Sequence, residues 1–301
     1  MFSTKTSAAG LSILSNSALI TLKVVVGLVT GSVSVLSEGI HSGVDLLAAL
    51  IAFFSIRSAV KPPDEDHQFG HGKIENVSGT IEALLIFVAA ALIVYQAAEK
   101  IRAGTGLVSI DLGIGIMAVS AVVNFFVSRH LHKVARSTDS VALEADAWHL
   151  TTDVYTSLGV MAGLVVVRLT GLSILDPIIA IGVAALILRA AWGITRKSVG
   201  GLLDVRLPIT EEEIIKASIT EHLGEVVGFH KLRTRKSGSQ RHIDVHLVLP
   251  KSTTLEEAHS LCDHLERDIR EKLPDVLITI HCEPCEEADE DICPPDRPSV
   301  G

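Results

Sequence analysis

Two histidine–aspartate pairs with a spacing of four residues lie inside apolar stretches of the sequence. They are His41 with Asp45, and His149 with Asp153. Residues four apart lie one above the other on a helix, so each pair offers an imidazole and a carboxylate to one point in space. Two such helices form a four-ligand cage. Two nitrogens and two oxygens suit a tetrahedral divalent transition metal, of which zinc is the common case.

Further carboxylates stand close to both pairs, with Glu38 before His41 and Asp146 before His149. For one pair alone, a buried polar helix that satisfies its own hydrogen bonds explains the residues about as well as a metal site. The same spacing occurs in two apolar stretches, which favours a metal site over a buried polar helix. Ionisable groups within a membrane span are costly and normally mark function. Calcium or magnesium would require more oxygen ligands.

A second group of candidate ligands, Asp64, His67 and His71, lies in a loop after the second apolar stretch. Gly70 and Gly72 disfavour a long helix there, so a folded loop would have to bring Asp64 to the two histidines. A solvated acidic loop explains this composition equally well.

The elements that must position the two pairs are membrane spans. The chain has 301 residues, of which 48% are hydrophobic, and several windows approach the twenty apolar residues that cross a bilayer. We predict a six-helix transmembrane bundle with spans near 11–30, 33–56, 77–98, 107–128, 145–168 and 174–194. No cleavable signal layout precedes the first span, so we expect that helix to remain. The net charge is −9 and no basic stripe is present to neutralise phosphates, which argues against nucleic acid as a partner.

The distribution of Lys and Arg predicts the orientation in the membrane. The segments 57–73 and 129–136, taken as loops, carry three basic residues each, whereas the links near Gly31 and Gly171 carry none. Positive charge marks the cytoplasmic side. We therefore expect a multi-pass protein of the cell (inner or plasma) membrane with both termini in the cytoplasm, although Lys100 and Arg102 run against this orientation.

The hydrophilic last third predicts a small cytoplasmic α+β domain in the order αββαβ. Residues 242–249 alternate between apolar and polar side chains, as in a half-buried strand, and Thr254 with Glu257 forms a capping box that opens a helix. The tail after Glu286 is rich in Asp, Glu and Pro, which is typical of disorder. The predicted domains are 1–206 (transmembrane), 207–285 (cytoplasmic) and 286–301 (disordered tail).

The sequence resembles the cation diffusion facilitator family, of the bacterial zinc/cadmium/iron-efflux type, over nearly its whole length. The resemblance is carried by GSVSVLSEGIH at 31–41 leading to Asp45, DEDHQFGHGK at 64–73, His149 through Asp153, and GFHKLRTRKSG at 228–238. It implies that His41, Asp45, His149 and Asp153 form a transport site at mid-membrane. It also implies that Asp64, His67 and His71 bind metal on the cytoplasmic side.

The same resemblance implies a ferredoxin-like or metallochaperone-like cytoplasmic domain that makes the protein a homodimer. Family positions that bind metal at the dimer interface are matched by His230, His246, His259, His281 and Glu283. Each of these histidines, taken alone, is more often a surface residue. Lys73 and Asp204 match a charge pair at the family's dimer contact. His41 stands where close bacterial relatives often have Asp, which favours zinc as the metal.

Together these features predict a Zn²⁺/H⁺ antiporter that exports metal by alternating access, and not an enzyme. His and Asp ligands lose protons when they bind metal, so protons and metal compete for the cage. No phosphate-binding GxxxxGK[ST] motif is present, and no organic cofactor is expected. The alternatives are Cd²⁺, Fe²⁺ or Co²⁺ as the main substrate, a metal sensor, or an intramembrane zinc metalloenzyme, whose HExxH signature is absent.

Overall fold

A computed structural model describes residues 2–30, 33–103, 111–172, 174–222 and 224–285, without the side chains of 2, 3, 30, 33–38, 40, 41, 103, 111–114, 164, 168 and 176. The chain divides into two compact units, Met1–Leu202 and Leu203–Gly301. Each unit is described by itself.

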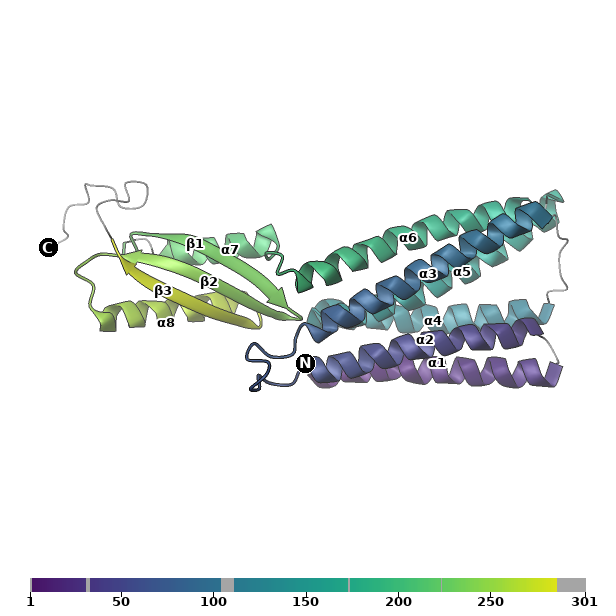
Figure 1. Cartoon of the computed structure of the whole chain (residues 1–301), viewed down its shortest axis with the longest axis horizontal. Coiled ribbons are helices and arrows are strands. Elements are labelled where there is room, and N and C mark those ends of the chain that lie inside the picture. Colours follow the sequence, from purple (N-terminus) through teal and green to yellow (C-terminus); the bar gives the residue numbers. More distant parts are fainter. Residues whose placement is uncertain (1, 31–32, 104–110, 173, 223, 286–301) are drawn as a thin grey trace. The chain divides into compact units, whose positions relative to one another are not determined.

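The first unit is a bundle of six long helices, as the sequence predicts (Figure 1). Within the described residues, five of them contain apolar windows long enough to cross a membrane, and the described part of α4 does not. The helices are α1 (Phe2–Thr30), α2 (Val33–Ala59), α3 (Ile74–Ala103), α4 (Asp111–Thr138), α5 (Val141–Thr170) and α6 (Leu175–Leu202).

The basic segment 129–136, taken as a loop from its charge, is instead the last part of α4. Lys and Arg are good helix formers, so the chain continues as a helix beyond the apolar window. The connection to α5 is only Asp139 and Ser140. The Ser140 hydroxyl caps α5 by accepting a hydrogen bond from the Leu143 amide. Gly171, with a φ of 72°, ends the helix.

Small residues let α3 and α6 approach closely. A Cβ atom added at Gly201 would lie 2.1 Å from Asn76 Nδ2, and one added at Gly79 would lie 2.5 Å from Ser198 Oγ. Close backbone approach through small residues is the usual way in which helices associate in a membrane, where no hydrophobic force draws them together. This contact fixes the side of α3 that faces the interior of the bundle.

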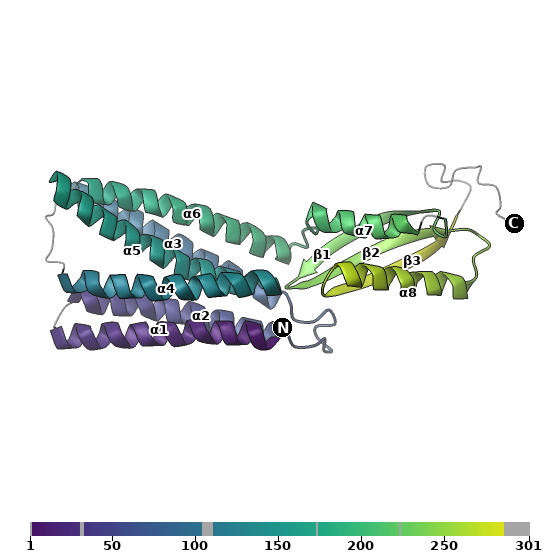
Figure 2. The ribbon, with the colours of Figure 1, turned by 180° about the vertical axis from the view of Figure 1, so that it is seen from behind.

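The second unit has the predicted αββαβ order, with α7 (Ile209–Glu221), β1 (Gly228–Ser237), β2 (Gln240–Leu249), α8 (Leu255–Lys272) and β3 (Val276–Pro284). The sheet order is β1-β2-β3, in which β1 and β2 are antiparallel and β2 and β3 parallel. Both helices cover one face of the sheet (Figures 1 and 2). The predicted inward residues of β2 pack there with α7 and α8: Ile243, Val245, Leu247 and Leu249.

The capping box at the start of α8 is confirmed. Thr254 Oγ1 accepts a hydrogen bond from the Glu257 amide, while the Glu257 carboxylate accepts one from the Thr254 amide. The apolar side of α8, with Leu261, Leu265 and Ile269, is thereby set against the sheet. The opposite face of the sheet is left to polar side chains.

Candidate metal centres

Three of the four predicted cage residues meet between α2 and α5. Asp45, His149 and Asp153 each offer a ligand atom, and these atoms lie within 4.8 Å of one another. His149 Nε2 is 3.1 Å from Asp45 Oδ1, and both residues are 5% exposed. His41 lies on α2, but its side chain is outside the described residues, as is that of Glu38. The fourth ligand therefore stays a prediction.

The three ligand-bearing residues are brought together by helical spacing and by the neighbouring helix α1. The four-residue interval puts His149 and Asp153 on one face of α5. Asn16 of α1 donates from Nδ2 to the backbone carbonyl of Asp45 at 3.5 Å. The resulting arrangement of one imidazole and two carboxylates can bind a divalent cation without using the backbone.

Two more buried carboxylates, Glu82 on α3 and Asp146 on α5, lie near the cage. Both residues are 0% exposed. Each interacts electrostatically with the other and with His149. Asp146 was noted from the sequence, but Glu82 was missed. The sequence shows Glu82 only as a single carboxylate inside the apolar stretch of α3. The packing of the helices was needed to show which way this side chain faces.

The loop between α2 and α3 brings Asp64 to both loop histidines. Asp64 Oδ1 is 3.1 Å from His67 Nδ1, and Asp64 Oδ2 is 3.2 Å from His71 Nε2. The His67 amide donates to Asp64 Oδ1 at 2.7 Å, and this hydrogen bond is the main reason that the pKa of Asp64 is lowered. Gly70, at a φ of 76°, permits the tight turn between the two histidines. The three ligand atoms form a compact group that can hold a metal.

A third group lies on the face of the sheet that the helices leave open. His230, His246 and Glu283 offer ligand atoms within 4.8 Å of one another. His230 Nε2 and His246 Nδ1 are 2.8 and 2.7 Å from the two oxygens of Glu283. His281 pairs with the same carboxylate at 3.4 Å. Hydrogen bonds from His246 and then His230 lower the pKa of Glu283, which keeps it ionised.

Strand register explains why this third group forms. His230 is paired with His246 across β1 and β2, and His246 with His281 across β2 and β3. Paired residues on neighbouring strands point to the same face, so three imidazoles stand in a row. His259 is not part of this group, because it lies exposed on α8, which covers the other face, and is 3.7 Å from Asp263.

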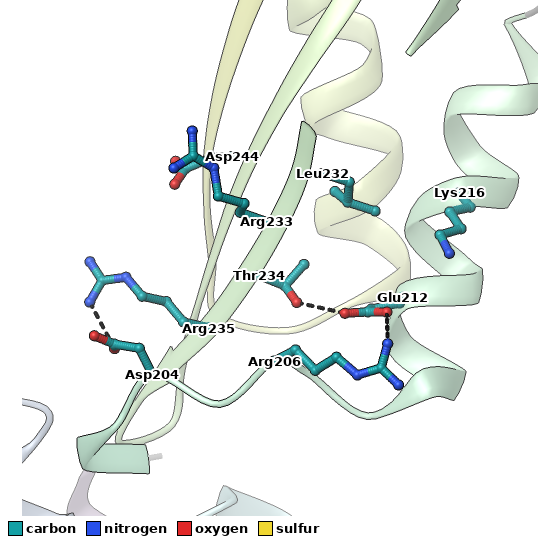
Figure 3. A pocket seen from close by; sticks show the side chains of 9 residues that line it. All are labelled: Asp204, Arg206, Glu212, Lys216, Leu232, Arg233, Thr234, Arg235 and Asp244. Atoms are coloured by element: carbon teal, nitrogen blue, oxygen red, sulfur yellow. Dashed lines mark hydrogen bonds and ion pairs between the residues drawn. The ribbon is translucent and has the colours of Figure 1, made fainter. Parts of the chain in front are cut away.

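The predicted charge pair of Lys73 and Asp204 involves one residue from each unit, so each is described in its own unit. Lys73 Nζ donates to the Leu202 carbonyl at 3.4 Å. Asp204 accepts a hydrogen bond from Arg235 at 3.3 Å, at the edge of a pocket of about 630 Å³ beside β1 (Figure 3). In the same pocket Arg206 and Thr234 both donate to Glu212. The pairing between Lys73 and Asp204 stays a prediction.

Sequence reasoning also missed a cysteine pair within the second unit. Cys262 of α8 and Cys282 of β3 are free thiols whose sulfur atoms are 3.3 Å apart. Burial raises the pKa of Cys262 to about 12, with Cys282 contributing. The two sulfur atoms meet because α8 packs on β3. This packing cannot be predicted from a local sequence pattern.

Comparison with known proteins decides the family. Residues 10–203 match the model of the cation efflux transmembrane domain, and residues 207–285 match that of the cation efflux protein cytoplasmic domain. The chain belongs to the cation efflux family. As a cation diffusion facilitator it is a multi-pass membrane transporter of metal cations and not an enzyme. The metalloenzyme alternative is therefore excluded.

Relatives of this cation efflux protein extend over most of its length. An uncharacterized transporter of Synechocystis sp. is 36% identical over 259 residues, which cover 86% of this chain and 84% of the relative. The cation-efflux pump FieF of Salmonella newport is 32% identical over 274 residues, covering 89% of each chain. The metal-bound C-terminal domain of the CzcD transporter from Thermotoga maritima covers 26% of this chain and 94% of that structure, at 24% identity and a TM-score of 0.24.

Proposed function

We propose that this cation efflux transporter exports Zn²⁺ from the cytoplasm in exchange for protons, with His41, Asp45, His149 and Asp153 as the transport site. The observation that carries the proposal is the buried group of Asp45, His149 and Asp153, supplied by two different helices. Asp45 lies about midway along α2, as expected for a site that is exposed alternately to the two sides of a membrane.

The donor set supports zinc over harder ions. With His41 as the fourth ligand, the cage has two nitrogens and two oxygens, which suits tetrahedral zinc. Ca²⁺ and Mg²⁺ prefer six or more oxygen ligands. Cd²⁺, Fe²⁺ and Co²⁺ accept similar donors and are the competitors to be measured alongside zinc.

Proton exchange follows from the chemistry of the same ligands. An imidazole must be neutral and a carboxylate ionised to bind metal, so metal loading releases protons and proton loading expels metal. Expelling a divalent ion against an inside-negative potential costs about 4.6 kcal/mol per 100 mV, twice the value for one elementary charge. Inward proton movement supplies this free energy.

The proposal is tested with the full chain in vesicles that contain a zinc-sensitive dye. We expect zinc flux that rises with the imposed pH gradient and is abolished in Asp153→Ala. Asp66→Ala, a change of the same kind in an exposed loop carboxylate, is the matched control and should keep the parent rate. Flux that ignores the pH gradient would rule out the antiport, and flux by Asp153→Ala at the parent rate would rule out the site.

We further propose that the protein is a homodimer whose cytoplasmic domains bind metal through His230, His246, His281 and Glu283. The open, imidazole-lined face of the sheet supports this, since it offers ligands on a surface that α7 and α8 do not cover. On this proposal zinc strengthens the dimer, Lys73 and Asp204 pair near its contact, and both termini are cytoplasmic. Sedimentation of the full chain in detergent, with zinc and with a chelator, tests it. Equal dimer stability in both conditions would contradict the role of zinc.

A further inference from the structure

A seam of buried polar side chains connects one end of the bundle to the transport cage. On α1 it consists of Lys5, Ser12 and Asn16, each at most 5% exposed. Their spacings of seven and four residues keep them on one face of the helix. On α3, on α5 and at the N-cap of α5 the corresponding buried residues are Glu75, Ser78, Glu82, Ser140, Asp146 and His149.

Glu82 and Asp146 are the acidic part of this seam. Ser78 Oγ donates to Glu82 Oε1 at 3.2 Å. Among the described side chains, Glu82 Oε2 is buried without a hydrogen-bond partner, and the buried Asp146 carboxylate has only the Ser12 hydroxyl beside it. Glu82 and Asp146 interact electrostatically as like charges.

Such an arrangement is costly in a membrane interior unless a cation is bound there at some stage. A buried polar group without a partner already costs free energy, and an unpaired buried charge costs more. Well-packed apolar side chains of similar size would avoid this cost, so two buried acids on neighbouring helices favour a ligand-binding role over a structural one.

We propose that Glu82 and Asp146 form a second cation site, through which divalent metal passes on its way to the transport cage. The inference rests on the transport function proposed above. Asp146 precedes His149 by three residues, about 4.5 Å along the helix axis, so an ion moves only a short distance between the two sites. The hydroxyls of Ser12 and Ser78 complete an all-oxygen donor set. This set binds divalent ions with less preference for zinc than the cage does, and weak binding suits a position that an ion must leave.

Two features support a path for the ion that starts at the end of the bundle near the Asp64 loop. They are the position of the loop ligands and a buried ion pair. The loop with Asp64, His67 and His71 directly precedes α3. Beyond it, Lys5 Nζ is 3.1 Å from Glu75 Oε1, and Ser140 Oγ donates to Glu75 Oε2 at 2.5 Å. This contact ties together the first turns of α1 and α3 and the cap of α5. It closes the seam in this conformation and has to open before an ion can reach Glu82.

The test uses Glu82→Gln, Asp146→Asn and the double variant, which remove charge while keeping side-chain size. Glu144→Gln is the matched control on α5, because Glu144 is partly exposed and paired with Lys197. Three quantities are measured on the full chain: the number of zinc ions bound at saturation, by equilibrium dialysis in detergent, the zinc dependence of the initial flux in vesicles, and the melting temperature in detergent.

We expect the double variant to bind one zinc ion fewer per chain and to need at least about tenfold more zinc for half-maximal flux, with an unchanged or higher melting temperature. Glu144→Gln should match the parent in all three. An unchanged ion count, or a lost ion with unchanged flux, would overturn the second site. If the double variant does not fold, the single variants and Glu82→Asp, which keeps the charge, are compared by the same count.

Asp153→Ala separates this inference from the proposed function. It should abolish flux while keeping the ion at Glu82 and Asp146. Parent-level flux in Asp153→Ala would contradict the transport site, whatever the ion count of the double variant. An unchanged count in the double variant, with flux lost in Asp153→Ala, would contradict the second site alone.

Discussion

Replacing Asp45 by asparagine should remove most of the zinc-dependent stabilisation of the transmembrane unit. The substitution keeps the shape of a side chain that is 5% exposed and 3.1 Å from His149 Nε2, but it removes the negative charge that binds the ion. Loss of a residue that only supports a metal ligand weakens binding by about 10- to 100-fold, so loss of a ligand should cost at least about 100-fold.

The corresponding stabilisation follows from mass action. At a zinc concentration of about 100 times the parent Kd, binding stabilises the folded state by about 2.7 kcal/mol. For a variant with a Kd about 100 times higher, the same zinc concentration gives only about 0.4 kcal/mol. For a unit of about 200 residues, the difference corresponds to a shift in Tm of roughly 5 to 9 °C.

Tryptophan fluorescence can measure this in the full chain, because both tryptophans, Trp148 and Trp192, lie in the transmembrane unit. The melts are compared with and without zinc in a His71→Ala background, which removes one ligand from the loop group. Asp66→Asn is the control for the loss of one carboxylate. A zinc-induced shift in Asp45→Asn equal to that of the parent would refute the assignment of Asp45 as a ligand.

Three further predictions concern the cytoplasmic domain. Arg241 is 6% exposed and makes two hydrogen bonds to Glu211, at 2.7 and 2.9 Å, so Arg241→Ala should destabilise the domain by about 3 kcal/mol. Hydrogen exchange of β2 amides measures this, and Arg267→Ala, at an exposed site of α8, should leave the exchange unchanged. The hydrogen bond from His222 lowers the pKa of Asp268 below its ordinary 3.8. The unfolded chain then takes up the proton first, so this stabilisation is complete above pH 3.8 and is lost as the pH falls toward the lowered pKa. Asp268→Asn should therefore lose less stability than the parent as the pH falls below about 4, and an equal loss in both proteins would contradict the pairing. Because the pKa of Cys262 is raised to about 12, alkylation at neutral pH should be at least about tenfold slower than for an ordinary thiol, after allowance for its partial exposure. Mass spectrometry of the alkylated peptide measures this rate. A rate equal to that of an ordinary thiol would show that Cys262 is not shielded.

The sequence predicted features that depend on local periodicity. The interval from His149 to Asp153 places both residues on one face of a helix, the alternation of β2 separates Ile243 and Val245 from His246, and the pair of Thr254 and Glu257 marks the start of α8. Each of these follows from the geometry of a single element. The order of helices and strands, and with it the fold class, was therefore predictable.

Features that depend on contacts between elements were not predictable in this way. Lys5 and Glu75 are 70 residues apart in sequence, and their contact depends on how the helices of the bundle pack. From the sequence, Glu82 is only one carboxylate in an apolar helix. The packing of the helices shows which way it faces. Positive charge alone could not separate a loop from a helix end, which is why residues 129–136 were taken as a loop.

The central claim is that one buried cage carries the metal, and metal flux by cage variants tests it most directly. His41→Ala, Asp45→Ala, His149→Ala and Asp153→Ala are each reconstituted and assayed for zinc flux beside the parent and Asp66→Ala. We predict that all four cage variants lose flux while Asp66→Ala keeps it. Zinc flux at the parent rate in the cage variants would contradict the account.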